Sequence, residues 1–243
     1  MEELRIQKYL SDCGVLSRRA AEKAVEEGRV KINAEAAIIG QKVDPRKDEV
    51  YLDGKHIIKK RGTHYVYIML NKPTGYVTTL SDDKGRKTVA SLVSDVGTRV
   101  YPVGRLDMDS EGLLLMTNDG EFTNMMTHPR HNIPKIYTVV VEETVTKSKL
   151  VELSGSMTID GYEIRPVECS IKNVRDTGTA IRMVLYEGRN RQIRKMCEKV
   201  GLTVKKLRRD AYGDLELDIK KGSWRYLCRE EVDYLKNNAG IKR

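Results

Sequence analysis

One acidic residue is a candidate for chemistry because its surroundings would hold it rigidly. Asp107 follows Gly-Arg-Leu, and a wholly apolar run at 113–116 comes shortly after it. That run has the length and composition of a fully buried strand, and Asn-Asp-Gly at 118–120 is a strong turn signal at its end. A carboxylate on a loop anchored in this way can be positioned accurately enough to react. Asp109 is equally acidic, and the spacing alone does not identify the reaction.

Positive charge is concentrated in one later segment. The chain has a net charge of +9, and residues 186–209 contain nine Lys and Arg residues against two Glu. Such a segment favours a polyanionic partner and predicts binding that weakens steeply with salt. Within it, a strand, a basic turn at 187–190 and a predicted helix over 191–200 form an arrangement suited to phosphate. The alternative is a solvated basic helix face without a ligand.

Three motifs occur in order along the chain. The first, at 104–120, is Gly-Arg-Leu-Asp-x-x-Ser-x-Gly-Leu-Leu-Leu-x-Thr-Asn-Asp-Gly. The others are Lys-x-Tyr-x-Val at 135–139 and Glu-Gly-Arg-Asn-Arg-Gln-Ile-Arg-Lys-Met at 187–196. Together they resemble the signature of the RsuA/RluB family of ribosomal-RNA pseudouridine synthases. The resemblance implies isomerisation of a specific uridine to pseudouridine in ribosomal RNA, with large-subunit 23S RNA favoured and small-subunit 16S RNA as the other target.

The resemblance also assigns roles to individual side chains. It selects Asp107 over Asp109 as the nucleophile, and leaves open attack at C1′, attack at C6 or a route through a glycal. Tyr137, on a predicted strand, would stack on the target base. Arg194 is the candidate partner that keeps Asp107 charged when the site closes. Because the reaction involves no redox change and no external group, it requires neither a metal nor another cofactor.

The N-terminal segment predicts two short helices followed by a small β element. Apolar residues at helical spacing over 6–13 predict the first helix, and Ser17 is a good N-cap for the second. Arg18 and Arg19 lie in the first turn, where the helix dipole disfavours cations, so they are candidates for clamping phosphates. Arg29 begins a short basic strand. These features resemble an S4 RNA-binding domain.

Further RNA-binding candidates lie in the second part of the chain. Lys72 belongs to a Lys-Pro-x-Gly element that resembles one in the family, and it could face nucleic acid at the mouth of the site. A plain turn is the alternative there. The expected partner is ribosomal RNA or a ribosome-assembly intermediate, and the candidates that would contact it here are Lys72, Arg105, Arg189, Arg191, Gln192 and Lys195.

The fold class expected from these patterns is α+β. A polar stretch at 59–62 suits a linker, so we expect an S4 RNA-binding domain at 1–61 and a pseudouridine synthase catalytic domain at 62–243. The second domain is expected to have a mixed, mainly antiparallel sheet with short helices, finishing in closing strands. No stretch has the length of a transmembrane helix and the N-terminus lacks a signal peptide's apolar region, so a cytoplasmic protein is expected. A monomer is expected because no long apolar stripe is unassigned.

Metal chemistry is disfavoured by the arrangement of potential ligands. The His-x-x-His stretch at 128–131 is interrupted by Pro129 and has no third ligand nearby, so a loop that touches RNA is the better interpretation. The four cysteines lie far apart, which suggests neither a disulfide framework nor a zinc site.

Two other functions remain possible on the sequence. A non-catalytic S4-type RNA-binding ribosome-assembly factor would use only the S4 module and the basic segment, but it has no reason to place Asp107 in a basic cleft. A glycoside hydrolase would use Asp107 and Asp109 as its two carboxylates, and leaves the RNA-binding features unexplained.

Overall fold

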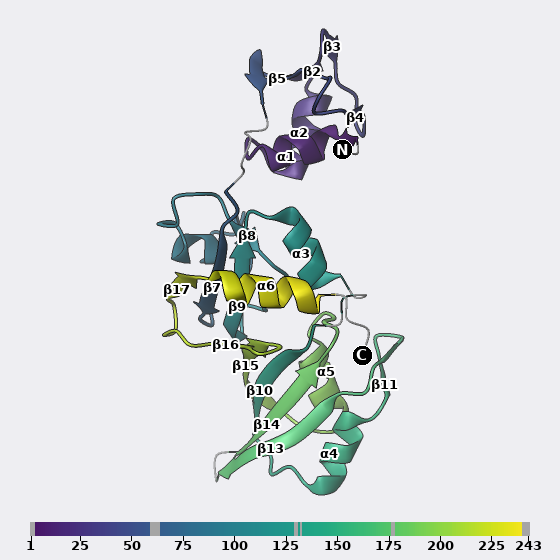
Figure 1. Ribbon diagram of the computed structural model, residues 1–243. Coiled ribbons are helices and arrows are strands. Elements are labelled where there is room, and N and C mark those ends of the chain that lie inside the picture. Colours follow the sequence, from purple (N-terminus) through teal and green to yellow (C-terminus); the bar gives the residue numbers. More distant parts are fainter. Residues whose placement is uncertain (1–2, 59–63, 129–130, 132, 176–177, 240–243) are drawn as a thin grey trace. The chain divides into compact units, whose positions relative to one another are not determined.

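The computed structural model describes residues 3–58, 64–128, 131, 133–175 and 178–239 (Figure 1). The chain forms two compact units, residues 1–65 and 66–243. The predicted linker and the boundary expected after residue 61 fall at 59–63, outside the described residues. Within the described ranges, no helix is long and apolar enough to cross a membrane.

The N-terminal unit packs short helices against small sheets. Its elements are β1 (Leu4–Arg5), α1 (Ile6–Asp12), α2 (Arg18–Glu26), β2 (Val30–Ile32), β3 (Glu35–Ala36), β4 (Lys42–Val43), β5 (Val50–Leu52) and β6 (Lys55–Ile57). Strand β1 pairs with β4, and the other strands form a sheet in the order β3-β2-β5-β6. Apolar residues from both helices, among them Leu10 and Ala24, are buried against Val30 and Val50 of this sheet.

Local signals in this unit predict the observed geometry. Ser17 Oγ accepts a hydrogen bond from Ala20 N at 3.1 Å, which confirms Ser17 as the N-cap of α2. The Asp-Gly pair at 53–54 joins β5 to β6, and both residues have positive φ. Positive φ at both central residues is the type I′ hairpin turn that Asp-Gly favours.

The second unit is built on one large sheet with helices on both faces. Its elements are β7 (Tyr67–Lys72), η1 (Val89–Leu92), β8 (Tyr101–Pro102), β9 (Glu111–Thr117), α3 (Gly120–Thr127), β10 (Lys135–Val141), α4 (Lys147–Ser154), β11 (Met157–Ile159), β12 (Tyr162–Ile164), β13 (Glu168–Arg175), β14 (Gly178–Leu185), α5 (Gln192–Lys199), β15 (Val204–Tyr212), β16 (Leu215–Glu216), β17 (Trp224–Tyr226) and α6 (Arg229–Asn238). The strand order is β13-β14-β10-β15-β9-β7-β17, with β16 beside β15 and β8 beside β9.

Strand directions confirm the predicted sheet type. Strands β9 and β15 pair in parallel, whereas β10 pairs antiparallel with both β14 and β15, and β7 pairs antiparallel with β9 and β17. The sheet is therefore mixed and mainly antiparallel, and the α+β class is confirmed.

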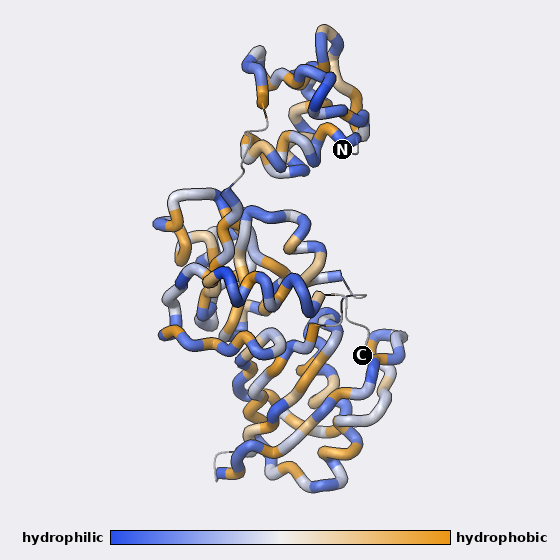
Figure 2. The backbone as a smooth tube through the Cα atoms, in the orientation of Figure 1, coloured by the Kyte–Doolittle hydropathy of each residue, from blue (hydrophilic) through white to orange (hydrophobic). Residues whose placement is uncertain are grey.

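Strand β9 is covered on both faces, which explains its uninterrupted apolar run. Leu114 and Met116 belong to a core cluster that includes residues of α5, whereas Leu113 and Leu115 belong to a second cluster with residues of α3 and α6. Figure 2 shows hydrophobic residues along the strands and a mostly hydrophilic α6. A strand buried on both sides needs apolar residues at every position. The predicted buried strand at 113–116 is confirmed.

The last element that the structure describes is a helix, α6, where the sequence predicts only closing strands. Strands β15, β16 and β17 do follow residue 204, but a helix comes after them. Its start carries a local signal, because the Glu231 carboxylate accepts a hydrogen bond from Cys228 N at 2.8 Å, as in a capping box. Val232 and Leu235 supply its buried side.

Asp119 caps α3 and connects it to β7. Its carboxylate accepts hydrogen bonds from Glu121 N (2.9 Å), Phe122 N (3.0 Å) and the Tyr67 hydroxyl (2.7 Å). We expect Asp119→Ala to lower the free energy of unfolding by about 2 kcal/mol, because it removes both the cap of α3 and the acceptor to which the Tyr67 hydroxyl donates. Thermal unfolding would register a fall in Tm of roughly 4–8 °C. Asp119→Asn keeps a cap acceptor and should lose less than half of this; equal losses would contradict the capping role.

Candidate active site

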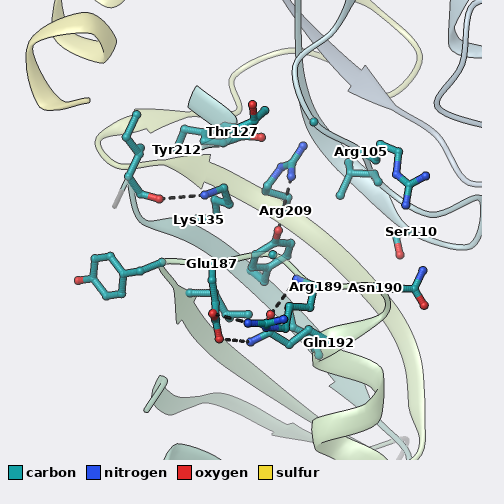
Figure 3. Close-up of a pocket in the computed structure, with 18 of the residues that line it drawn as sticks. Arg105, Ser110, Thr127, Lys135, Glu187, Arg189, Asn190, Gln192, Arg209 and Tyr212 are labelled. Carbon is teal, nitrogen blue, oxygen red and sulfur yellow. Dashed lines mark hydrogen bonds and ion pairs between the residues drawn. The ribbon is translucent and has the colours of Figure 1, made fainter. Parts of the chain in front are cut away.

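A cavity of about 520 Å³ opens beside the centre of the large sheet (Figure 3). This volume lies within the range of sites that hold small molecules. Four parts of the chain line it: the loop 104–110 before β9, the end of α3 with His128, His131 and Ile133 after it, the segment 185–193 from the end of β14 into α5, and strands β10 and β15. Asp107 is one of the lining residues, together with Tyr137, whereas Asp109 is not. Of the two candidate nucleophiles, Asp107 is therefore the one that lines the cavity.

The loop that carries Asp107 is held through its own backbone. Consecutive carbonyl oxygens from residue 106 to residue 110 all accept hydrogen bonds. The bonds run from Thr78 Oγ1 to Leu106 O (2.5 Å), from Lys72 Nζ to Asp107 O (2.9 Å) and Ser110 O (2.7 Å), from Gly75 N to Met108 O (2.7 Å), and from Arg194 Nη2 to Asp109 O (2.9 Å). A loop paired in this way has few alternative positions, so the carboxylate it carries is fixed in place.

Gly112 explains the glycine in the Asp-x-x-Ser-x-Gly pattern. Its φ is +106°, and a Cβ at this position would lie 2.3 Å from the backbone oxygen of Arg209 in β15. Glycine alone permits this conformation and this approach. The contact brings the loop of Asp107 next to the residues of β15 that line the cavity.

Two arginines, Arg191 and Arg194, lie within 4 Å of the carboxylates of Asp107 and Asp109. Arg191 Nη1 lies 3.9 Å from Asp107 Oδ2, and Arg191 Nη2 lies 3.1 Å from Asp109 Oδ2. Arg194 Nε lies 3.3 Å from Asp109 Oδ2. Contrary to the expected pairing, Arg194 therefore contacts Asp109 rather than the Asp107 carboxylate. The physical reason is that Arg194 Nη1 donates to Val204 O, in β15, at 3.4 Å. Held there, the guanidinium reaches the Asp109 carboxylate but not the Asp107 carboxylate.

The turn before α5 holds Arg191 in an uncommon backbone conformation. Its φ of 51° and ψ of 30° are left-handed, a region that non-glycine residues adopt mainly where the surroundings enforce it. Gln192 enforces it here, because its amide donates to Glu187 Oε1 (3.2 Å) and its oxygen accepts from Arg189 N (2.9 Å). Gln192 is buried. Gln192 also lines the cavity, so its side chain braces the turn from inside, and its contact with RNA stays a prediction.

Arg209 also lines the cavity, although it is not among the site residues predicted from the sequence. It is 2% exposed, and its Nε donates to Leu113 O at 2.7 Å while its Nη1 lies 3.5 Å from the Tyr137 hydroxyl. The sequence places it only within the basic segment. The available signal is alternation, because Leu207 and Ala211 flank Arg209 at the spacing of one strand face and both are buried.

Comparison with known families accounts for both units. Residues 66–199 match the family described as RNA pseudouridylate synthase, and residues 4–50 match the S4 domain. The chain belongs to the RNA pseudouridylate synthase family. This synthase is therefore an RNA-modifying isomerase with an N-terminal S4 domain, as the resemblance implies.

Relatives of the synthase align along nearly its whole length. It is 40% identical to an "Uncharacterized RNA pseudouridine synthase" of Aquifex aeolicus (strain VF5), over 100% of this chain and 97% of the relative. It is 37% identical to "Ribosomal large subunit pseudouridine synthase B" of Bacillus subtilis (strain 168), over 96% and 95%. A crystal structure of a pseudouridylate synthase aligns with a TM-score of 0.67 and 28% identity, over 96% of this chain and 99% of that one.

The S4 domain of the synthase presents some of its predicted cations to solvent. Arg18 and Arg19 are exposed in the first turn of α2. Arg29 is also exposed, but its guanidinium donates to both oxygens of Asp53 (2.7 Å each) and to Glu27 (3.1 Å). Arg18 and Arg19 are thus better placed than Arg29 to bind phosphate.

The predicted cations of the second unit also differ in their surroundings. Arg105 and Arg189 are exposed and line the cavity, and the Arg189 guanidinium lies 4.3 Å from the centre of the Tyr162 ring. Lys195 forms an ion pair with Asp160. Positions 129, 130 and 132, next to the two histidines of the His-x-x-His stretch, lie outside the described residues.

Lys72 lies beneath the Asp107 loop of the synthase rather than at the mouth of the cavity. Its side chain is 0% exposed, and its Nζ donates to the carbonyl oxygens of Pro73 (3.2 Å), Asp107 and Ser110. Burial lowers the pKa of Lys72 to about 8, against the opposing effect of the Asp107 and Asp109 carboxylates. In this structure the Lys72 ammonium therefore faces the underside of the loop rather than the mouth of the cavity, and contact with nucleic acid stays a prediction.

The lowered pKa of Lys72 predicts a dependence of stability on pH. Folding lowers this pKa from 10.5 to about 8, so the unfolded chain binds more protons between these values. This contribution to the free energy of unfolding is fully present above the pKa of Lys72 in the unfolded chain, and it is lost as pH falls through about 8. Between about pH 7 and pH 9.5, wild type should gain about 2 kcal/mol of unfolding free energy relative to Lys72→Met. Denaturant titrations across this range test it, and parallel curves for the two proteins would contradict it.

Proposed function

We propose that this synthase converts one specific uridine of ribosomal RNA to pseudouridine, with large-subunit 23S RNA as the favoured target. The observation that carries the proposal is Asp107, an aspartate on a pinned loop that lines a cavity rich in cations. The large-subunit assignment is supported by the Bacillus subtilis relative, whose name states that target and which is 37% identical over nearly the whole chain.

Binding begins with the RNA backbone. Exposed cations of the S4 domain and of the cavity rim would contact phosphates, which orients the RNA without reading its sequence. The target base must then leave its stack, at a cost of a few kcal/mol that these contacts offset. The residues we assign to this step are Arg18, Arg19, Arg29, Arg105, Arg189, Arg191 and Lys195, with Lys72 and Gln192 supporting the site from inside.

Inside the cavity, Asp107 supplies the reacting carboxylate. The C1′–N1 bond of the uridine breaks, the uracil turns, and a new bond forms between C1′ and C5 while the hydrogen on C5 is lost. Arg191 places a positive charge 3.9 Å from the Asp107 carboxylate. Arg194 acts as a positioning residue through the carbonyl and carboxylate of Asp109.

Tyr137 provides a surface for the base. Its ring lines the cavity from β10 and is 7% exposed, so its position is set by the sheet rather than by a loop. A flat ring held by the core can stack on a uracil that has left the RNA helix.

The test is conversion by the purified full chain. Unmodified 16S and 23S transcripts, free and assembled with ribosomal proteins, would be incubated with the protein and mapped for pseudouridine. We expect one position of 23S RNA to be modified. A single modified position in 16S RNA would overturn the target assignment, and binding without conversion of any substrate would favour the non-catalytic binding factor.

A further inference from the structure

The cavity contains a buried arginine, Arg209, and a partly buried lysine, Lys135, which the reaction outlined above leaves unused. Lys135 Nζ lies 5.9 Å, and the Arg209 guanidinium carbon 4.6 Å, from the centre of the same ring, that of Tyr212. All three residues line the cavity. In Figure 3, Arg209 extends into the middle of the cavity between Lys135 and Arg105.

Neither cation has a carboxylate partner within the described part of the chain. Among the residues that the structure describes, the Lys135 ammonium donates to the carbonyl oxygen of Ile133, at 3.2 Å. Arg209 uses Nε and Nη1 for Leu113 O and the Tyr137 hydroxyl, and its buried Nη2 has no hydrogen-bond partner among the described residues. A buried guanidinium with an unused donor lowers the stability of the fold unless a ligand accepts a hydrogen bond from that donor.

The two cations also destabilise one another. Burial, and then the charge of Arg209, lower the pKa of Lys135 to about 8. Two like charges held on one ring without a counter-ion indicate a site arranged for a negatively charged group that arrives from outside.

The reaction generates such a group on the uracil itself. When the C1′–N1 bond breaks, its electron pair leaves with the base, and the charge is shared between N1 and the carbonyl oxygens. When a carboxylate instead adds at C6, the electrons of the ring double bond move onto the O4 carbonyl. In both routes a uracil oxygen becomes more negative before the C1′–C5 bond forms and the C5 proton leaves.

We propose that Arg209 and Lys135 form an oxyanion-binding site. It binds a carbonyl oxygen of the uracil while the C1′–N1 bond is replaced by the C1′–C5 bond. Arg209 Nη2 donates to that oxygen, and the Lys135 ammonium adds a second donor. The assignment rests on the proposed function, and it makes both residues catalytic. A phosphate of the RNA backbone is the other oxygen ligand of similar charge, but Arg209 is 2% exposed and lies among the residues that contact Tyr137, the proposed base platform.

The test compares Lys135→Met, Arg209→Met and Arg209→Lys in the full chain. The readouts are single-turnover release of tritium from C5 of labelled uridine in the RNA, the RNA dissociation constant with its salt dependence, and the melting temperature. Lys236→Met is the matched control, because Lys236 also lies over a tyrosine ring, 5.0 Å from the centre of Tyr67, but outside the cavity.

We expect Lys135→Met and Arg209→Met to slow tritium release on the order of 100-fold at saturating RNA, with unchanged RNA affinity and salt dependence. Arg209→Lys should recover part of the loss, and Lys236→Met should keep the wild-type rate. Since Lys135 is a partly buried cation with no carboxylate partner among the described residues, the melting temperature of Lys135→Met should equal or exceed that of wild type. This variant keeps the test decisive if Arg209→Met does not fold.

Three results would overturn the proposal in distinguishable ways. A wild-type rate with a lowered melting temperature in Lys135→Met would assign the lysine a structural role. Weaker RNA binding with a smaller salt dependence, and a normal rate at saturation, would assign both cations to a phosphate. A wild-type protein that forms no pseudouridine would refute the proposed function itself.

Discussion

Asp107→Asn should reduce pseudouridine formation by about 10⁴-fold or more while leaving RNA binding within about twofold of wild type. An amide has nearly the size and shape of the carboxylate but cannot act as the nucleophile. The loop would keep its position, because its carbonyl oxygens are bonded through the backbone and these bonds do not involve the Asp107 side chain. Single-turnover tritium release and a filter-binding assay on the same RNA measure the two quantities.

Asp109→Asn is the matched control for this prediction. Its carboxylate does not line the cavity, and it pairs with Arg191 and Arg194 at 3.1 and 3.3 Å. Loss of these ion pairs should slow the reaction only about tenfold, through poorer positioning of the two guanidiniums. An inactive Asp109→Asn beside an active Asp107→Asn would reverse the assignment of the nucleophile.

Lys72→Met should slow the reaction about 100-fold without altering the salt dependence of RNA binding. Its ammonium donates to the carbonyl oxygens of Asp107 (2.9 Å) and Ser110 (2.7 Å), so the variant leaves these oxygens unpaired beneath the loop. Unpaired buried carbonyls cost about 1–3 kcal/mol each, and the loop would move to reach water. A displacement of about 1 Å at the nucleophile is sufficient for a loss of this size.

The salt dependence distinguishes this role from direct contact with RNA. A lysine that neutralises a phosphate releases counterions on binding, and its removal lowers the slope of log K against log salt by about 0.9. Lys72 is 0% exposed, so its removal should leave the slope unchanged. The exposed Lys84, on the loop after β7, provides the control, since Lys84→Met should keep the wild-type rate. A reduced slope and a normal rate for Lys72→Met would restore the RNA-contact role.

Features with local causes could be predicted from the sequence. The Ser17 cap depends on a hydroxyl and an amide three residues apart, and the buried strand at 113–116 depends on its own composition. The Asp107 loop was also recognisable, because its motif is contiguous. Its support was not, since the groups that donate to its backbone come from β7, the segment after it and α5.

Buried cations are the part of the site that sequence patterns describe poorly. Charged residues are expected at the surface, because burial without a partner is costly. Lys72 and Arg209 are buried because their acceptors, the carbonyl oxygens of Ser110 and Leu113, come from distant parts of the chain. Arg194 presents a related problem, since two aspartates only two residues apart are both plausible partners, and only the packing of α5 against the loop selects one of them.

The most direct measurement is a pseudouridine map of 16S and 23S RNA from cells that lack this gene, complemented with wild type, with Asp107→Asn or with Asp109→Asn. We expect one pseudouridine of 23S RNA to disappear on deletion and to return with wild type and, at least in part, with Asp109→Asn, but not with Asp107→Asn. An unchanged map in the deletion, or restoration of the missing pseudouridine by Asp107→Asn, would contradict the proposed function and its nucleophile respectively.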